Sequence, residues 1–211
     1  MIQRLPLILT AALVGGPAFC CLAQAAPVQW KLSEGGNGHW YEVRTSPDYP
    51  STGLTWEAAR LAAEGLGGYL ATITSDQEND FVYFTAEANV EAYWIEDGAG
   101  NWQGPYLGGY QPGPPTQPEA DPAAGWAWVT GELWDYTDWA TGEPNNYNDN
   151  EHYLQYFWNP DYPDDEPAWN DVLMYDGVMS YMVEWVPEPS TILLAALGLL
   201  GLTVRGWRRK R

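Results

Sequence analysis

The residues of this chain with the clearest chemical potential are oxygen donors near its centre and toward its C-terminal half. Three carboxylates and two carboxamides gather there, beside a proline and a tryptophan. They are Glu143, Asn145, Glu151, Asn170 and Asp171, next to Pro144 and Trp169. Calcium takes roughly six to eight oxygen ligands from carboxylates, amide carbonyls, backbone carbonyls and water. The residue types therefore predict a calcium site that can also hold a sugar.

Other residues offer little support for catalysis. His39 and His152 are the only histidines, and a histidine without cysteines nearby makes a poor zinc site. A second acidic group comprises Asp161, Asp164, Asp165 and Glu166. Paired carboxylates can hydrolyse glycosides, but a solvated acidic loop explains this group more simply. The sequence has no nucleophile elbow, phosphate loop or Cys–His pair, and we expect no enzymatic activity.

The N-terminus has the pattern of a secretory signal peptide. Arg4 precedes an apolar run over residues 5–22, and the small-x-small site Ala23-Gln24-Ala25 follows. We expect cleavage after Ala25, so that residues 1–25 form the signal. Both cysteines lie within it, so the mature chain has no disulfide to stabilise it.

The C-terminus combines a Pro187-Glu188-Pro189 motif, an apolar stretch over 192–204 and five basic residues in 205–211. This order resembles the PEP-CTERM sorting signal of Gram-negative bacteria that carry an exosortase and make exopolysaccharide. The resemblance implies that residues 187–211 hold the protein in the inner membrane transiently and are then cut off. The protein would then reach the cell surface or the extracellular matrix. A plain transmembrane tail anchor is the alternative, although 192–204 is shorter than the roughly 20 residues of a typical spanning helix.

Processing would leave a strongly acidic domain. Only Lys31, Arg44 and Arg60 remain of the nine basic residues once the signal and the tail are removed, against nearly all of the 28 acidic residues. Such a surface repels nucleic acid and anionic membranes, and it favours divalent cations. The 13 tryptophans and 14 tyrosines indicate a packed core rather than a disordered acidic chain.

The pattern between the two ends predicts an α+β domain. Thr55 begins one helix that Gly67-Gly68 ends, and a capping box of Ser75 and Glu78 begins a second helix. Region 97–125 is rich in glycine and proline and predicts long loops. The predicted strands are 40–43, 69–73, 126–129, 153–157, 172–174 and 181–185. Two early helices followed by strands favour an antiparallel sheet.

From Trp40 to Trp185 the chain resembles the C-type lectin-like domain, so we place this domain at residues 26–186. The segments that carry the resemblance are 56–60, Gly67-Gly68-Tyr69-Leu70-Ala71, 106–109, 128–131, Glu143-Pro144-Asn145, Trp169-Asn170-Asp171 and 183–185. The family usually has two disulfides, but Ala63, Tyr153, Met174 and Val183 stand where its cysteines would be. The segment 158–167 is an insertion beside the predicted site.

The resemblance also assigns roles to the oxygen donors. It implies that calcium binds Glu143, Asn145, Glu151, Asn170 and Asp171, and that the Glu143-Pro144 bond is cis. Two sugar hydroxyls would bind the ion and exchange hydrogen bonds with Glu143, Glu151, Asn145 and Asn170. Family members with Glu-Pro-Asn prefer mannose-, glucose- or fucose-type sugars, whereas those with Gln-Pro-Asp prefer galactose. The expected partners are therefore glycans or exopolysaccharide; the alternative is a structural or protein-binding domain that binds no sugar.

Overall fold

The computed structural model describes residues 26–46, 53–87, 94–96, 98, 100–112, 121–162, 167–174, 177–178 and 180–187. The predicted signal peptide, the apolar segment 192–204 and the acidic residues 164–166 lie outside these ranges. Within them, no helix combines the length and the apolar composition that a bilayer crossing requires.

The two predicted helices are present as α1, Trp56–Gly65, and α2, Asp76–Glu87. Thr55 caps α1, because its hydroxyl accepts the N–H of Ala58 at 3.1 Å. The capping box at α2 is only half formed. Ser75 Oγ accepts the N–H of Glu78 at 3.3 Å, but the Glu78 carboxylate accepts the N–H and hydroxyl of Thr74, both at 2.8 Å.

The strands form one sheet in the order β1-β2-β9-β5-β7-β8, with β3 paired to β9, and β4 and β6 paired to β5. Their bounds are β1 Val28–Gln29, β2 Trp40–Thr45, β3 Tyr69–Leu70, β4 Ile95–Glu96, β5 Trp102–Tyr110, β6 Ala127–Trp128, β7 Tyr153–Trp158, β8 Ala168–Val172 and β9 Ser180–Trp185. Short 3₁₀ turns occur at η1, Leu32–Glu34, and η2, Tyr147–Asp149. The α+β class is confirmed. The sheet is mixed rather than wholly antiparallel, since β5 and β9 pair in parallel at Tyr106 and Tyr181.

The prediction of long loops over 97–125 was wrong at its centre, where the nine-residue strand β5 lies. Its pairing with β7 shifts register between Gln103 and Tyr106, and this irregularity accommodates Pro105 inside the strand. Gly108 is required by a close approach, because a Cβ there would lie 2.5 Å from the carbonyl oxygen of Leu70. Glycine and proline here mark a bent strand that packs closely on its neighbours.

Two strand boundaries also differ from the predictions. The strand expected over 69–73 covers only Tyr69–Leu70, and the strand expected over 172–174 lies earlier, at Ala168–Val172. The second shift matters for function, because it places Trp169, Asn170 and Asp171 within β8 rather than in a preceding loop. Register with β7 then fixes these three residues, with Leu154 opposite Asp171.

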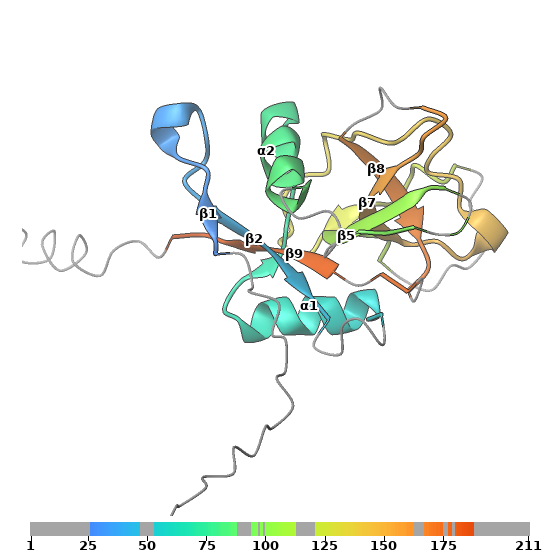
Figure 1. The fold of residues 1–211 in the computed structure, drawn as a ribbon, viewed down its shortest axis with the longest axis horizontal. Coiled ribbons are helices and arrows are strands. Elements are labelled where there is room, and N and C mark those ends of the chain that lie inside the picture. The colour runs from blue at the N-terminus through green and yellow to red at the C-terminus, as the bar shows by residue number, and fades with distance from the viewer. Residues whose placement is uncertain are drawn as a thin grey trace, which may run out of the picture.

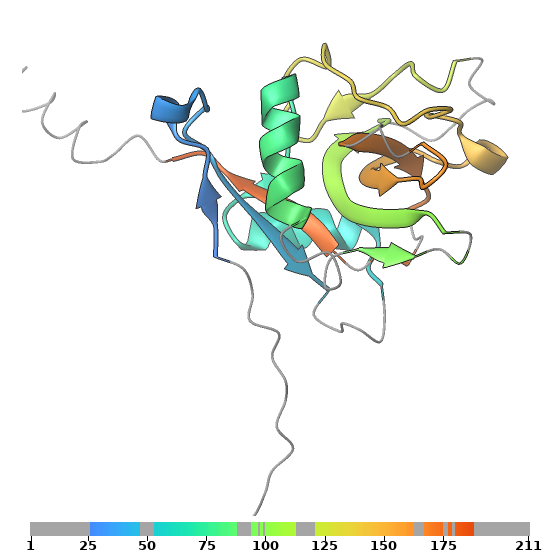
Figure 2. The same ribbon diagram turned by 45° about the horizontal axis from the view of Figure 1, so that its top comes forward.

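The two helices flank the long strands of the sheet. Helix α1 contacts β3 and β9, while α2 contacts β2, and Figure 1 shows them on opposite sides of the β2–β9 pair. Figure 2 shows β5 curving around β7 and β8. This curvature creates a second lobe, from which the loop over residues 129–152 extends. The predicted oxygen donors all lie in this lobe.

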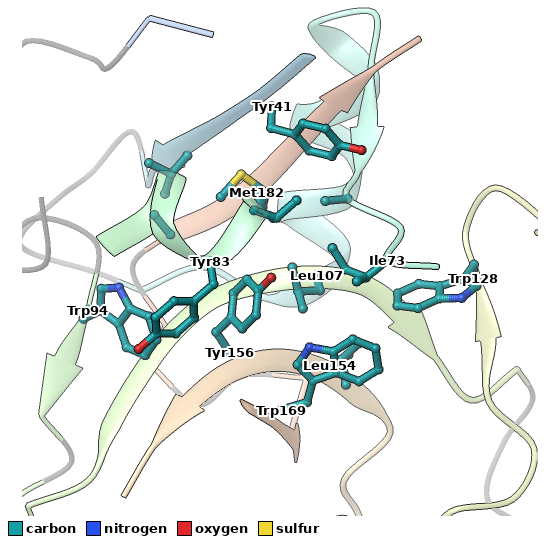
Figure 3. Close-up of a cluster of buried hydrophobic side chains, with 14 of the residues drawn as sticks. Tyr41, Ile73, Tyr83, Trp94, Leu107, Trp128, Leu154, Tyr156, Trp169 and Met182 are labelled. Atoms are coloured by element: carbon teal, nitrogen blue, oxygen red, sulfur yellow. The ribbon is translucent and has the colours of Figure 1, made fainter. Parts of the chain in front are cut away.

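Aromatic residues fill the core in place of disulfides. Trp128 and Trp169 meet edge to face at 5.8 Å, and Tyr83 meets Tyr156 at 5.3 Å and Trp94 at 5.6 Å (Figure 3). Each such ring buries a large apolar area. Two of the four positions where the family has cysteines, Ala63 and Val183, are fully buried in one cluster. Met174 is instead 48% exposed.

Candidate functional site

The loop that carries Glu143 is held against β8 by backbone pairing. Trp139 and Trp169 form a parallel bridge, in which the N–H of Trp169 donates to the carbonyl of Asp138 at 2.8 Å. The N–H of Ala140 donates to the carbonyl of Trp169 at 2.9 Å. A turn follows, in which the Glu143 N–H donates to the Ala140 carbonyl at 2.9 Å. The loop therefore begins beside the strand that contains Asn170 and Asp171.

A buried asparagine fixes the same strand from the other side. Asn79, on α2, is fully buried, and its Oδ1 accepts the indole N–H of Trp169 at 2.9 Å and the hydroxyl of Tyr156 at 3.0 Å. Its Nδ2 donates to Asp138 at 2.7 Å and to the Pro167 carbonyl at 3.3 Å. One side chain thus connects α2, β7, β8 and the start of the loop. Sequence reasoning missed this role.

Asp171 joins the loop to the sheet. Its side chain is completely buried, and its Oδ1 accepts the N–H of Asn145 at 3.0 Å while its Oδ2 accepts the N–H of Asn146 at 2.7 Å. Burial raises the pKa of Asp171 above its usual range, and these two N–H donors oppose that shift. The Glu143-Pro144 bond that precedes them is cis, as expected.

Glu151 closes the loop through a second pair of bonds. Its Oε2 accepts the N–H of Tyr147 at 2.8 Å, and its own N–H donates to Oδ1 of Asn146 at 3.0 Å. Asn146 has a φ of 45°, a left-handed conformation that asparagine tolerates better than most residues. The sequence analysis did not single out Asn146. In the structure Asn146 connects Asp171 with Glu151. Its backbone N–H donates to Asp171, its side-chain Oδ1 accepts from the Glu151 N–H, and its left-handed backbone makes the turn between them.

The carboxyl group of Glu143 lacks part of its hydrogen bonding. Its Oε2 is buried and has no hydrogen-bond partner in the described part of the chain. Burial and the adjacent carboxylate of Asp171, together with the charge of Glu151, raise the pKa of Glu143 to about 8. The two N–H donors favour the ionised form of Asp171, and its negative charge beside Glu143 contributes to the raised pKa of Glu143. Without a cation, these carboxylates repel one another.

The two carboxamides lie in different environments. Asn145 is exposed and its side chain hydrogen-bonds Glu143, which lowers the pKa of that carboxyl group in part. Asn170 is buried, at 8% exposure, and its Oδ1 has no hydrogen-bond partner among the described residues. A buried carbonyl oxygen without a partner is costly, by about 1–3 kcal/mol. The structure therefore brings Glu143, Asn145, Glu151 and Asp171 together. Asn170 precedes Asp171 in β8 and makes no side-chain hydrogen bond to the other four within the described residues. We refer to these five residues as the Glu143 cluster.

The Glu143 cluster has the donor set of a hard cation rather than of zinc. Over the residues described, no group of three His, Cys, Asp or Glu side chains is arranged to hold a metal by itself. Any cation here would therefore need amide oxygens as well as carboxylates, which is usual for calcium. The buried oxygens of Glu143 and Asn170 that lack partners fit such an ion, because coordination would satisfy both.

The insertion does not displace Asp171. Strand β7 continues to Trp158, and residues 159–162 make a turn in which the Tyr162 N–H donates to the Asn159 carbonyl at 3.0 Å. The chain returns at Pro167, and β7–β8 pairing is regular from Phe157 opposite Ala168 to Tyr153 opposite Val172. The described part of the insertion, residues 158–162 and 167, therefore lies at the turn end of the hairpin. The Glu143 cluster lies at the other end.

Comparison with known proteins agrees with this architecture. Residues 186–210 match the family model of the PEP-CTERM protein-sorting motif. The chain is similar to halomucin of Haloquadratum walsbyi, with 31% identity over 169 residues, and to ladderlectin of Oncorhynchus mykiss, with 27% over 124 residues. It spans only 1% of halomucin and 54% of ladderlectin. It also resembles a perlucin-like protein of Mytilus galloprovincialis at 25% identity, covering 81% of this chain and 89% of the relative.

Solved structures show the same fold. Human lithostathine superposes with a TM-score of 0.52 at 17% identity, covering 87% of this chain and 99% of that one. The C-type lectin CEL-I from Cucumaria echinata gives 0.50 at 23% identity, covering 71% and 91%. The fold is that of the C-type lectins. The chain therefore combines a C-type lectin-like fold with a C-terminal PEP-CTERM sorting motif.

Proposed function

We propose that this protein binds carbohydrate in a calcium-dependent manner and is exported to the cell surface or the exopolysaccharide matrix. The observation that carries the proposal is the Glu143 cluster. The carboxyl group of Glu143 is close enough to Asp171 and Glu151 for their charges to raise its pKa, and two buried oxygens, Glu143 Oε2 and Asn170 Oδ1, lack partners among the described residues. A calcium ion would offset the repulsion and satisfy both oxygens. The lectin-like relatives support the sugar, and the sorting motif supports export.

The proposed ligands of the ion are Glu143, Asn145, Glu151, Asn170 and Asp171. When bound, calcium would supply coordination to two neighbouring sugar hydroxyls. Glu143 and Glu151 would accept hydrogen bonds from these hydroxyls, while the amide groups of Asn145 and Asn170 would donate to them. Asp171 would keep its backbone contacts to Asn145 and Asn146, and so position the loop. The Glu143-Pro144-Asn145 motif favours mannose-, glucose- or fucose-type sugars.

We propose that both ends of the chain are processed during export. Residues 1–25 would direct export and be removed, and residues 187–211 would be recognised by an exosortase-type enzyme. The segment 192–204, outside the described residues, would hold the protein in the inner membrane transiently. We propose no enzymatic role.

The second candidate function is a structural or protein-binding domain. It is favoured by the bonds that Asp171 and Asn146 make without any ligand, because these bonds already hold the loop in place. In that case the Glu143 cluster would stabilise the domain and contact no sugar.

A glycan array in calcium and in EDTA distinguishes the two functions. The lectin function predicts binding to mannose-, glucose- or fucose-terminated glycans that EDTA abolishes and Glu143→Gln weakens. Asp149→Asn, which removes a charge from the exposed turn η2, is the matched control and should bind like the wild type. A calcium-dependent rise in melting temperature without glycan binding would support the structural function. No response to calcium in either assay would refute calcium binding at the Glu143 cluster and leave only the ligand-free structural function.

A further inference from the structure

A second concave site lies between helix α1 and the strands β5 and β7. It is a hollow of about 360 Å³, within the size range of small-ligand pockets. Three aromatic residues, Trp56, Tyr110 and Tyr153, form one part of its lining. Three charged residues of α1, Glu57, Arg60 and Glu64, form another. We refer to this feature as the α1 hollow.

The α1 hollow and Asp171 lie on opposite faces of the β7–β8 hairpin. Tyr153 pairs with Val172, and both belong to the hydrophobic cluster around Trp56. The next pair along the same two strands is Leu154 and Asp171. Successive residues of a strand point to opposite faces, so Tyr153 and Asp171 lie on opposite sides of the β7–β8 hairpin. None of the five residues of the Glu143 cluster lines the α1 hollow, so a ligand there would not contact the proposed calcium ligands.

The aromatic part of the lining is rigid. The Trp56 ring lies 4.8 Å from Tyr153 and 5.4 Å from Tyr110, and its indole N–H donates to the Leu107 carbonyl at 2.8 Å. Trp56 is 3% exposed, so the two tyrosines supply most of the accessible ring surface. No described residue hydrogen-bonds either tyrosine hydroxyl. The hollow therefore presents apolar ring faces next to two phenol groups that can donate and accept.

The charged part of the lining limits the charge of a ligand. Arg60 donates to both carboxylate oxygens of Glu57, at 2.9 and 2.7 Å, and also to Oε1 of Glu64. The guanidinium thus already occupies the place between the two carboxylates that a cationic ligand would take. Two acidic groups and one basic group leave a net charge of about −1, which disfavours anions. A neutral molecule rich in hydroxyls suits this lining best.

We propose that the α1 hollow binds a neutral pyranose unit of a glycan without calcium. The C–H face of the sugar ring packs on Tyr110 and Tyr153, whose amphipathic rings suit such contacts. Its hydroxyls exchange hydrogen bonds with the two phenol groups and donate to Oε2 of Glu64, which accepts no bond from a described residue. The proposal goes beyond calcium-dependent binding at the Glu143 cluster, and either site can exist without the other.

Saturation-transfer NMR in EDTA tests this proposal. The probes are methyl α-mannoside, methyl α-glucoside, methyl β-galactoside and N-acetylglucosamine, with glucuronate and choline as anionic and cationic comparisons. At least one neutral sugar is expected to bind in EDTA. Tyr110→Leu and the double variant Arg60→Gln, Glu64→Gln are expected to weaken that binding at least about tenfold. The variant Glu143→Gln serves as control and should retain it.

A second variant guards against effects on folding. Glu64 is exposed, so Glu64→Trp fills the opening without removing a core contact, and it should abolish the EDTA-resistant binding. The absence of neutral-sugar binding in EDTA would overturn the proposal, as would binding that no hollow variant changes. Tighter binding of glucuronate or choline would also overturn it. Loss of only the EDTA-sensitive binding in Glu143→Gln would show that the two sites are separate.

Discussion

The side chain of Asp171 accepts the backbone N–H of Asn145 at 3.0 Å, although the two residues are far apart in the chain. The same carboxylate also accepts the N–H of Asn146. A strand at the C-terminal end of the domain thereby fixes the loop that carries the Glu-Pro-Asn motif. The two segments are consequently held together by these bonds without an ion.

This relationship predicts the effect of Asp171→Asn. The carboxamide has only one oxygen, so it cannot accept from both N–H groups, and one buried donor loses its partner. We expect the free energy of unfolding in EDTA to fall by about 2 kcal/mol, since hydrogen bonds to charged groups are worth roughly 1.5–3 kcal/mol. Urea denaturation measures this change. Asp149→Asn removes an equal charge from the exposed turn η2, and equal losses in the two variants would contradict the prediction.

The pH dependence of stability reports on Glu143. Its folded-state pKa is raised to about 8, so between its ordinary pKa and about 8 the folded chain binds more protons than the unfolded chain. Stability in EDTA should therefore fall as pH rises through this window. Glu143→Gln lacks this titration, so its stability relative to the wild type should increase between about pH 5 and pH 9.

Urea unfolding of both proteins at several pH values in EDTA measures this difference, with Asp149→Asn as a matched control. A difference that is constant with pH would show that Glu143 ionises without penalty. Addition of calcium at about pH 8 should reverse the order and stabilise the wild type more than Glu143→Gln, because only the wild type gains the ion–carboxylate contact.

Sugar preference should follow the Glu143-Pro144-Asn145 motif. The double variant Glu143→Gln, Asn145→Asp exchanges the acceptor and donor positions of the proposed site, and the resemblance to galactose-preferring lectins then predicts a shift toward galactose. Competition with methyl α-mannoside and methyl β-galactoside in calcium measures the ratio of affinities. If the ratio is unchanged, the calcium-dependent sugar binds elsewhere.

Asn79 should have a large effect on stability, because it connects α2 to β7, β8 and the loop. Asn79→Ala leaves the buried indole N–H of Trp169 without its acceptor, whereas the Tyr156 hydroxyl keeps its bond to the Asn79 backbone carbonyl at 3.2 Å. We expect the free energy of unfolding to fall by about 2 kcal/mol, since an unsatisfied buried group costs roughly 1–3 kcal/mol. Thermal and urea unfolding test this value, with Gln77→Ala on the exposed face of the same helix as the control. Similar stabilities of the two variants would contradict the role of Asn79.

Some local elements could not be predicted from neighbouring residues. Gly104, Pro105, Gly108 and Gly109 favour loops by local propensity, yet they lie in β5. Tertiary contacts require this composition, because Gly108 lies too close to Leu70 to carry a Cβ and the register shift accommodates Pro105. The parallel pairing of Tyr106 with Tyr181 likewise depends on a distant strand. Local patterns do not encode such pairings.

The sequence by itself determined the residue types of the proposed site, the two helices with the Thr55 cap, the class of the fold and the sorting motif. These features depend on residue identity and short spacing, which local chemistry specifies. Tertiary structure alone decided that Asp171 would meet Asn145 and Asn146, that Asn146 would reach Glu151, and that Oε2 of the half-buried Glu143 would be buried without a partner among the described residues. Those outcomes depend on strand register and burial, which arise only when distant segments pack together.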